Sequence, residues 1–510
     1  MNSGEKNVKT VFTLTAVLMC IAMQLGAQTV YVATTGSDTS DGSFEHPFAT
    51  IPKAISVTTV PGESIYVRGG TYFPTGTINI SRSGTSTNRY YLLSYPGERP
   101  LLNFSTEPYG SRGIRVSGSY WHIKGFDITR AGDNGMNMSG SNNIIEFCSF
   151  SENYDTGLQL GGGASNNQII NCDSYFNRDT TQGNADGFAP KLDVGSGNYF
   201  YGCRSWQNSD DGWDGYLRPS NNIRTTLENC WCFMNGYLKT GLPSSGNGNG
   251  YKLGGGDNTN ADSLRHDMTL KNCLSFDNRV KGYDQNNNRG SMVLLNCTAY
   301  HNGTNYSISG PIASAESVVV RNCVALGSYG SLGSYVIQGT NSWMPPFVVT
   351  NADFVSVDTT GVRGPRNPDG SLPDVAFMHL ADGSDLIDSG TNVGLPFYGN
   401  APDLGCFESN YPNSVVVETG KPRQFRLEQN YPNPFNPSTH IGFSVETTQR
   451  TTLDVFNVLG QMVATLFDGV AEAGLRYDVQ FDGRDLPSGV YYYRLASGTR
   501  TESKKLLLLK

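Results

Sequence analysis

Seven cysteines recur along the middle of the chain at intervals that exclude most folds. They are separated by 24, 31, 27, 43, 24 and 26 residues, and six of the seven are followed five positions later by asparagine. The cysteines are Cys148, Cys172, Cys203, Cys230, Cys273, Cys297 and Cys323, and the asparagines are Asn153, Asn177, Asn208, Asn235, Asn278 and Asn302. A period in the twenties is typical of a solenoid, in which each repeat packs on its neighbours.

The residues around each cysteine indicate which kind of solenoid this is. Segments such as IINCDSYFN, LKNCLSFDN and LLNCTAYHN are rich in β-favouring residues and lack helical periodicity. Glycine supplies 60 of 510 residues and charged residues only 16%, which suits an all-β protein with many turns. We therefore predict that residues 28–408 form a right-handed parallel β-helix. Its cysteines and asparagines should stack in buried ladders, because identical positions meet on adjacent coils.

A second register lies between the cysteines, where a glycine precedes a large apolar residue. Its glycines are Gly135, Gly157, Gly187, Gly212, Gly250 and Gly282. When these glycines are aligned, Asp186 and Asp211 both fall one residue before the glycine, so they should stack on consecutive coils. Asp214 and Lys252 both fall two residues after it and should stack as well. The register therefore predicts an acidic cluster with a lysine one coil away.

The predicted cluster contains Asp186, Asp210, Asp211 and Asp214. Four neighbouring carboxylates repel one another unless a cation or protons intervene, and an all-oxygen donor set suits Ca²⁺. None of the six histidines lies near these aspartates in the sequence, which argues against zinc. On spacing alone, a structural calcium site and a solvated acidic turn remain open. The long interval between Cys230 and Cys273 predicts an inserted loop near the cluster.

Three segments at this cluster resemble a known family. NADGFAPK (184–191), NSDDGWDGY (208–216) and NGYKLGG (249–255) are similar to the calcium and catalytic motifs of family 9 polysaccharide lyases, the PelL-type pectate lyases. Residues 31–55 and 384–408 also resemble that family. The resemblance implies that Asp186, Asp210, Asp211 and Asp214 bind Ca²⁺ and that Lys252 is the Brønsted base. The implied reaction is cleavage of pectate (polygalacturonate) by β-elimination, with 4,5-unsaturated products.

The chemistry of this reaction constrains the lysine. The C5 proton of a uronide is too weakly acidic to be removed unaided, and Ca²⁺ at the C6 carboxylate would neutralise its charge. A lysine with its ordinary pKa of about 10.4 is protonated at neutral pH. Calcium lowers that pKa and the aspartates oppose the effect. We therefore expect activity that rises above neutral pH.

Other functions remain open at this point. The polymer could be another uronate, such as rhamnogalacturonan, and the motifs do not distinguish endo from exo cleavage. A glycoside hydrolase would use paired carboxylates but has no need of Lys252. A non-catalytic, calcium-binding β-helix adhesin is the third alternative. Five basic residues near the motifs are candidate binders of substrate carboxylates or ordinary surface residues: Lys191, Arg218, Arg279, Lys281 and Arg289.

The two ends of the chain point to export. Residues 1–27 have the basic start and apolar run of a signal peptide. Residues 409–424 are a predicted linker, and 425–510 contain some seven short strands that suit a small β-sandwich. NYPNPFNPST, FNVLGQMV and LPSGVYYYRL resemble the type A sorting domain of type IX secretion, which implies that secretion machinery as a partner.

Charge and hydropathy limit the other partners. The net charge of −8 argues against nucleic acid, since phosphate binding needs a basic face. No second long apolar stretch follows the signal peptide. We expect a monomer without a membrane span, located outside the cell or at its surface.

Overall fold

The computed structural model describes residues 28–257, 263–367, 369–397, 399–409, 424–471, 473, 476–484 and 486–510. The predicted signal peptide and nearly all of the predicted linker lie outside these ranges. One short α-helix occurs in the described part of the chain, α1 (Ile51–Val57), together with the 3₁₀ turn η1 (Asn351–Asp353). In these ranges no helix combines the length and the apolar character needed to cross a membrane.

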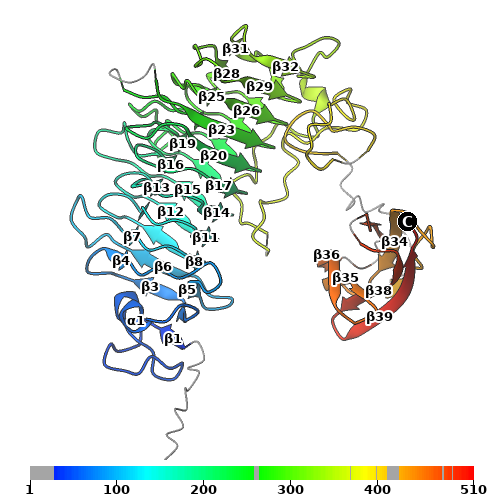
Figure 1. The fold of residues 1–510 in the computed structure, drawn as a ribbon, viewed down its shortest axis with the longest axis horizontal. Coiled ribbons are helices and arrows are strands. Elements are labelled where there is room, and N and C mark those ends of the chain that lie inside the picture. Colours follow the sequence, from blue (N-terminus) through cyan, green and yellow to red (C-terminus); the bar gives the residue numbers. More distant parts are fainter. Residues whose placement is uncertain are drawn as a thin grey trace, which may run out of the picture.

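The chain from Thr29 to Gly339 winds through three parallel sheets, and its coils stack in sequence order (Figure 1). Sheet A contains β1 (Thr29–Val32), β2 (Ser64–Val67), β5 (Tyr90–Ser94), β8 (Trp121–Lys124), β11 (Ile144–Glu146), β14 (Gln168–Ile170), β17 (Asn198–Tyr201), β20 (Ile223–Glu228), β23 (His266–Lys271), β26 (Met292–Leu295), β29 (Val318–Arg321) and β32 (Ile337–Gly339).

The other two sheets contain ten strands each. Sheet B contains β3 (Gly70–Tyr72), β6 (Pro100–Asn103), β9 (Asp127–Thr129), β12 (Ser149–Ser151), β15 (Asp173–Tyr175), β18 (Arg204–Trp206), β21 (Trp231–Phe233), β24 (Leu274–Phe276), β27 (Thr298–Tyr300) and β30 (Val324–Leu326). Sheet C contains β4 (Ile78–Ile80), β7 (Ile114–Val116), β10 (Met136–Met138), β13 (Leu158–Leu160), β16 (Phe188–Pro190), β19 (Trp213–Asp214), β22 (Tyr251–Lys252), β25 (Lys281–Asp284), β28 (Thr304–Ile308) and β31 (Gly330–Leu332). The predicted right-handed parallel β-helix is confirmed as the fold, but its last strand ends at Gly339 and not near residue 408.

The cysteine register sets the stacking of the coils. Each of the seven cysteines immediately precedes a strand of sheet B, and the residues that follow them pair in register from Ser149 to Val324. All seven thiols are buried and none forms a disulfide. Their Sγ atoms donate to backbone carbonyls, as Cys172 does to Ile170 at 3.4 Å. The predicted cysteine column is therefore confirmed, and its role is packing.

The asparagine column forms a hydrogen-bonded ladder inside the coils. The amide of Asn177 donates to Oδ1 of Asn208 at 2.8 Å, and the amide of Asn208 donates to Oδ1 of Asn235 at 3.0 Å. The same bond links Asn153 to Asn177 and continues from Asn235 through Asn278 to Asn302. Each Asn Oδ1 also accepts a backbone N–H from the preceding coil, which satisfies polar groups that water cannot reach.

Replacing Asn208 with alanine should destabilise the β-helix. The change leaves the buried N–H groups of Asn177 without their acceptor and Oδ1 of Asn235 without one donor. Each buried polar group left unsatisfied costs about 1–3 kcal/mol, so we expect a clear fall in the guanidinium midpoint of unfolding. Asn88→Ala is the matched control, because Asn88 is exposed outside the ladder. Equal midpoints for the two variants would contradict the ladder's role.

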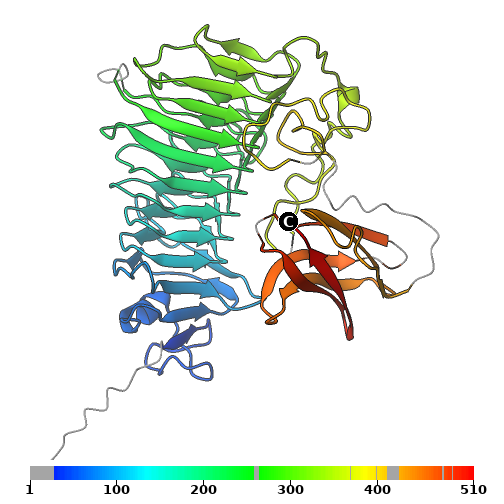
Figure 2. The same ribbon diagram turned by 45° about the vertical axis from the view of Figure 1, so that its right-hand side comes forward.

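After the last coil, the described residues between 340 and 409 fold back along sheet B; we call this segment the C-terminal strap (Figure 2). Phe377 of the strap packs on Phe276 of β24 with ring centroids 4.7 Å apart. Arg204 of β18 donates to the strap carbonyls of Val362 at 2.9 Å and Gly364 at 3.0 Å. The strap thus covers the aromatic column on the outer face of sheet B, where Tyr175 stacks on Trp206 at 4.3 Å.

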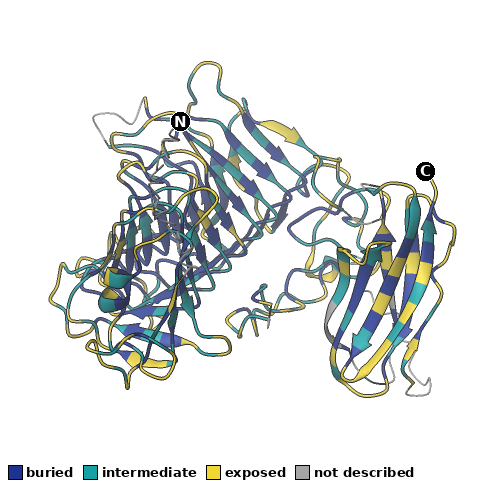
Figure 3. Ribbon diagram, turned by 60° about the horizontal axis from the view of Figure 1, so that its bottom comes forward, coloured by how far each residue is buried: buried dark blue, intermediate teal, exposed yellow. Residues whose placement is uncertain are grey.

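The C-terminal residues form two antiparallel sheets with their own core. One sheet contains β33 (Arg426–Leu427), β34 (Ser438–Ser444) and β37 (Arg476–Asp482). The other contains β36 (Met462–Ala471), β35 (Gln449–Asn457), β38 (Gly489–Ser497) and β39 (Arg500–Leu508). Buried and exposed residues alternate along several of these strands, including β38 (Figure 3). Phe443 of one sheet packs against Phe467 of the other at 5.1 Å, so the predicted β-sandwich is confirmed.

Candidate functional site

Sheet C carries the predicted acidic cluster. Trp213 pairs with Tyr251 and Asp214 with Lys252, as the glycine register requires. Trp213 and Tyr251 belong to the core inside the coils. Because side chains alternate along a strand, Asp214 and Lys252 project from the opposite, outer face of sheet C.

Three of the four predicted metal ligands lie together at this position. Asp186, Asp211 and Asp214 each offer one carboxylate oxygen within 4.8 Å of the others, and all three residues are buried. Asp186 precedes β16 and accepts the N–H of Asp211 at 3.1 Å, which fixes the two acids on consecutive coils. The predicted stacking of Asp186 and Asp211 is therefore confirmed.

Asp210 is buried beside this group but is not part of it. Its Oδ1 accepts a hydrogen bond from the backbone N–H of Asn247. Burial, followed by the charges of Asp211 and Asp186, raises the pKa of Asp210 to about 9. The structure thus brings together three of the four aspartates and places the fourth under the inserted loop.

The inserted loop, residues 236–249, closes over the acidic cluster. The N–H of Asn249 donates to Oδ1 of Asp211 at 2.9 Å, and Arg279 donates to the carbonyls of Gly246 and Asn247. Since the loop donates to Asp210 and Asp211, it orients two of the predicted ligands. The prediction of a loop near the cluster is correct.

Two buried lysines face the three carboxylates. Nζ of Lys252 lies 3.1 Å from Oδ2 of Asp211 and 3.3 Å from Oδ1 of Asp214. Nζ of Lys191 lies 2.6 Å from Oδ2 of Asp186 and 3.4 Å from Oδ2 of Asp214. Lys191 therefore pairs with the chain's own aspartates. It is a buried residue and not an ordinary surface residue.

The charges in this cluster shift one another's pKa values. Burial, with help from Asp214 and Asp211, raises the pKa of Asp186 to about 7 although Lys191 opposes the shift. Burial would lower the pKa of Lys252, but the surrounding aspartates, Asp214 and Asp211 foremost, hold it well above its usual value. Without another cation at the carboxylates, Lys252 is therefore an ammonium ion.

Sequence spacing missed two neighbours of the cluster. His266 lies behind Asp214, with Nδ1 2.8 Å from the carbonyl of Gly215 and Nε2 2.8 Å from Oγ1 of Thr225. Burial lowers the pKa of His266 to about 4, and both ring nitrogens are engaged, so it supports the strand as a neutral side chain. The ring of Tyr216 lies 5.6 Å from Nζ of Lys252.

The remaining basic candidates have different surroundings. Arg218 is more than half exposed, donates to Oη of Tyr216 at 2.8 Å and pairs with Asp257 at 3.0 Å. Lys281 pairs with Asp284 at 2.9 Å. Arg279 holds the inserted loop, as described above. Arg289 is half-buried, and its backbone N–H donates to the carbonyl of Leu264 at 3.1 Å. Of the five candidates, Arg218 thus combines exposure with a position beside Tyr216 and Lys252.

The donor set fits a hard divalent cation. Asp186, Asp211 and Asp214 supply only oxygen atoms, and Oδ2 of Asp211 is buried without a hydrogen bond of good geometry. Calcium takes six to eight oxygen ligands, and carboxylates of this kind are its usual protein donors. Oδ1 of Asn249 and Oγ of Ser209 are also buried and have no hydrogen-bond partner among the described residues.

Comparison with known proteins places this geometry in a family. Residues 30–327 match the family model described as "Pel9A-like, right handed beta helix region". Pectate lyase L of Dickeya chrysanthemi is 38% identical over 395 residues, covering 74% of this chain and 90% of that protein. Pectate lyase L of Paenibacillus polymyxa is 37% identical, covering 66% of this chain and 78% of that protein.

Solved structures and the C-terminal sandwich agree with this assignment. The crystal structure of pectate lyase Pel9A superposes with a TM-score of 0.69 at 36% identity, covering 75% of this chain and 96% of that one. A rhamnogalacturonan lyase gives a TM-score of 0.62 at 28% identity, covering 70% and 97%. Residues 429–509 match the secretion system C-terminal sorting domain. The chain therefore belongs to the Pel9A-like right-handed β-helix family of polysaccharide lyases and carries a C-terminal sorting domain.

Proposed function

We propose that the chain is an exported, calcium-dependent lyase that cleaves pectate by β-elimination. The observation that carries the proposal is the pairing of Lys252 with Asp214 on the outer face of sheet C, beside the buried carboxylates of Asp186 and Asp211. β-Elimination requires a base close to the cation that neutralises the substrate carboxylate. Lys252, one coil away from the carboxylates, is an amine in that position. The pectate lyases that this chain resembles support the choice of polymer.

In this proposal Asp186, Asp210, Asp211 and Asp214 hold the metal. Bound calcium would neutralise the substrate carboxylate and so make the neighbouring C5–H bond more acidic. Asp210 can contribute through Oδ2 while its Oδ1 keeps the N–H of Asn247, which holds the carboxylate in place. The inserted loop that carries Asn247 is therefore part of the proposed binding site.

Lys252 takes the C5 proton in this proposal. The C5–H electron pair forms the C4=C5 bond and the C4–O4 bond breaks, with the proton on Nζ and the electron pair on O4. Because the aspartates raise the pKa of Lys252, the neutral amine is scarce at neutral pH. Activity should rise with pH, and a cation shared by these aspartates would reduce their hold on the ammonium.

The substrate could differ from pectate within the same chemistry. The similarity to a rhamnogalacturonan lyase, at 28% identity, makes that polymer the second candidate. A hydrolase would use paired carboxylates as acid and base or nucleophile and would have no need of an amine beside them, whereas Nζ of Lys252 lies 3.1 Å from Asp211. An adhesin would use the carboxylates for calcium but would not need the lysine as a base.

Export follows from the two ends of the chain. We infer that residues 1–27 direct passage across the inner membrane and that the type IX secretion machinery recognises the sorting domain. The domain has its own core and supplies none of the residues at the carboxylate site. We therefore expect it to leave catalysis unchanged, with the lyase acting outside the cell or at its surface.

A direct assay tests the proposed function. Incubation with polygalacturonate should produce the ultraviolet absorbance of a 4,5-unsaturated uronide, and EDTA should abolish it until excess Ca²⁺ is added. Rhamnogalacturonan in a parallel reaction identifies the preferred polymer. Reducing ends without the absorbance would indicate hydrolysis instead, and binding without cleavage would indicate an adhesin.

A further inference from the structure

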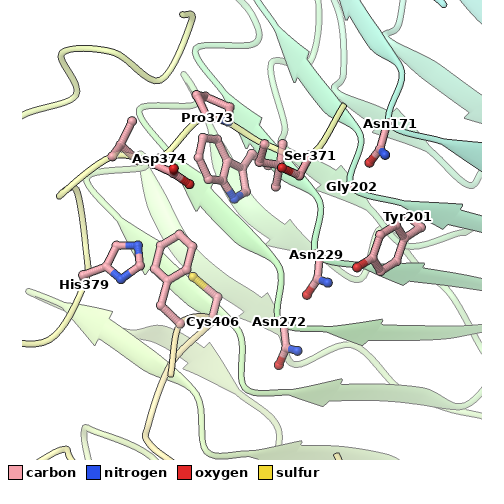
Figure 4. Close-up of a pocket in the computed structure, with 14 residues that line it drawn as sticks. Asn171, Tyr201, Gly202, Asn229, Asn272, Ser371, Pro373, Asp374, His379 and Cys406 are labelled. Carbon is pink, nitrogen blue, oxygen red and sulfur yellow. The ribbon is translucent and has the colours of Figure 1, made fainter. Parts of the chain in front are cut away.

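A pocket of about 560 Å³ lies at the edge where the coils turn from sheet A into sheet B, beneath the C-terminal strap. One side is formed by the turns that follow β14, β17, β20 and β23, and the other by strap residues around Asp374 and His379 (Figure 4). The carboxylate site is on the outer face of sheet C, and no residue of the proposed lyase site lines this pocket. It is therefore a separate feature of the molecule.

A row of amides lines the turn side of the pocket. Asn171, Asn229 and Asn272 each follow a strand of sheet A, with Gly202 at the same turn of the intervening coil. All three asparagines have left-handed backbones, with φ of 51°, 53° and 50°, a conformation that asparagine tolerates better than most residues. In Figure 4 their side chains stand one below another along the pocket wall.

These amides have no partners in the described part of the chain. The side chains of Asn171, Asn229 and Asn272 make no hydrogen bonds to other described residues, and Oδ1 of Asn171 is covered by Gly202 of the next coil. Side-chain amides that have no partner within the protein usually hydrogen-bond to water or a ligand. The row therefore presents donors and acceptors to whatever fills the pocket.

The turn geometry alone does not explain these free amides. Asn322 occupies the same turn three coils after Asn229, with φ of 54°. There the strap contacts the turns directly: the side chain of Asn322 donates to the carbonyl of Thr391 at 2.8 Å and accepts the N–H of Thr391 at 2.9 Å. Where the strap contacts a turn asparagine, strap atoms satisfy the side-chain amide. Over Asn171, Asn229 and Asn272 the strap lies farther from the turns and leaves a pocket.

The strap side of the pocket is aromatic and lacks cations. His379 stacks on Phe407 with ring centroids 4.0 Å apart and an interplanar angle of 12°, and the Phe407 ring is nearly perpendicular to that of Trp231, with centroids 6.1 Å apart. Burial lowers the pKa of His379, which keeps the imidazole neutral. The lining contains Asp374 but no lysine or arginine among the described residues. The wall therefore offers apolar rings and one negative charge.

We propose that this pocket binds a neutral sugar unit. Amides and a carboxylate suit hydroxyl groups, which both donate and accept, and aromatic rings suit the apolar C–H faces of a sugar ring. The volume lies within the usual range of about 300–1,000 Å³ for small-molecule sites. A uronate fits poorly, because its carboxylate would meet Asp374 and find no cation. The site thus selects against the acidic units that the proposed lyase site would take.

The binding can be measured without reference to catalysis. Methyl β-D-galactopyranoside and the sodium salt of methyl β-D-galacturonopyranoside differ only in the oxidation of C6, so they form a matched pair of probes. Saturation-transfer NMR and calorimetry on the full chain, in EDTA, should detect the neutral glycoside at millimolar concentration. The uronate should bind at least tenfold more weakly.

The double variant Asn229→Gly with Asn272→Gly removes two amides while glycine keeps the left-handed turns. We expect at least a tenfold loss of affinity for the neutral glycoside, with unfolding midpoint and lyase rate unchanged. Asn222→Gly, an exposed left-handed asparagine in another turn, is the matched control and should bind normally.

Three outcomes would overturn the proposal: no binding of the neutral glycoside, equal binding of the uronate, or undiminished binding by the double variant. If the double variant loses stability, crystals of the unaltered chain soaked in the glycoside decide the matter, since density elsewhere or nowhere contradicts the site. A failed lyase assay would leave this measurement unaffected, because it contains neither calcium nor cleavable polymer.

Discussion

Replacing Lys252 with alanine is expected to abolish elimination while the fold and the calcium site persist. Lys252 supplies no oxygen ligand, and its side chain contributes two ion pairs to Asp211 and Asp214 at 3.1 and 3.3 Å. Removal of a positioned general base typically lowers the rate by about 10²–10⁴-fold. Calcium affinity should stay equal or increase, because the variant removes a competing positive charge from the carboxylates. The measurements are kcat on polygalacturonate and calcium affinity by calorimetry.

The arginine variant separates the two possible roles of this side chain. Lys252→Arg keeps a positive charge near Asp211 and Asp214, but guanidinium stays protonated and cannot accept the C5 proton. If Lys252 is the base, the arginine variant should be nearly as inactive as the alanine variant at every pH. If Lys252 only holds a substrate carboxylate, arginine should retain most of kcat and change mainly KM.

Lys281→Ala provides the matched control for both variants. Lys281 is on β25, one coil beyond β22, and pairs with Asp284 at 2.9 Å rather than with the three-carboxylate group. It should retain kcat within about threefold of the unaltered chain, since it provides no base. An active Lys252→Arg variant, or an equally inactive Lys281→Ala variant, would contradict the assignment of the base.

The repeat explains why so much of this site could be predicted from the sequence. On a parallel β-helix, one position in a coil lies directly on the same position in the next, so alignment of glycines is also alignment in space. The pairing of Asp214 with Lys252 and the bond from the N–H of Asp211 to Asp186 both follow from that rule. The ladders of cysteine and asparagine follow from it as well.

The parts that could not be predicted are those outside the repeat. The inserted loop has no counterpart in neighbouring coils, so the bond from Asn247 to Asp210 could not be inferred from any register. The ion pair of Lys191 depends on the direction of a long side chain rather than on its position in the strand. His266 is more than fifty residues from Asp214 in the sequence and reaches Gly215 through the stacking of sheet A beside sheet C.

Replacing Asp211 with asparagine should weaken calcium binding more than it disturbs the fold. Oδ1 of Asp211 accepts the N–H of Asn249 at 2.9 Å, and an asparagine can keep that bond. What is lost is the charge at Oδ2, which is buried without a hydrogen bond of good geometry and lies 3.1 Å from Nζ of Lys252. Because calcium affinity follows the charge of its ligands, we expect a loss of roughly ten- to a hundredfold.

Two calcium concentrations should rise together in this variant: the one that gives half-maximal activity and the one that gives half of the thermal stabilisation. Both report binding to the folded chain, and stabilisation grows with the ratio of free calcium to its Kd. Asp284→Asn is the control, because Asp284 is buried on the same sheet but pairs with Lys281 outside the three-carboxylate group. Excess calcium should restore part of the activity of Asp211→Asn, since Asp186 and Asp214 remain. Full activity in the presence of a strong chelator would show that these carboxylates serve catalysis without a metal. The proposed assignment of the aspartates as metal ligands and of Lys252 as the base would then be wrong.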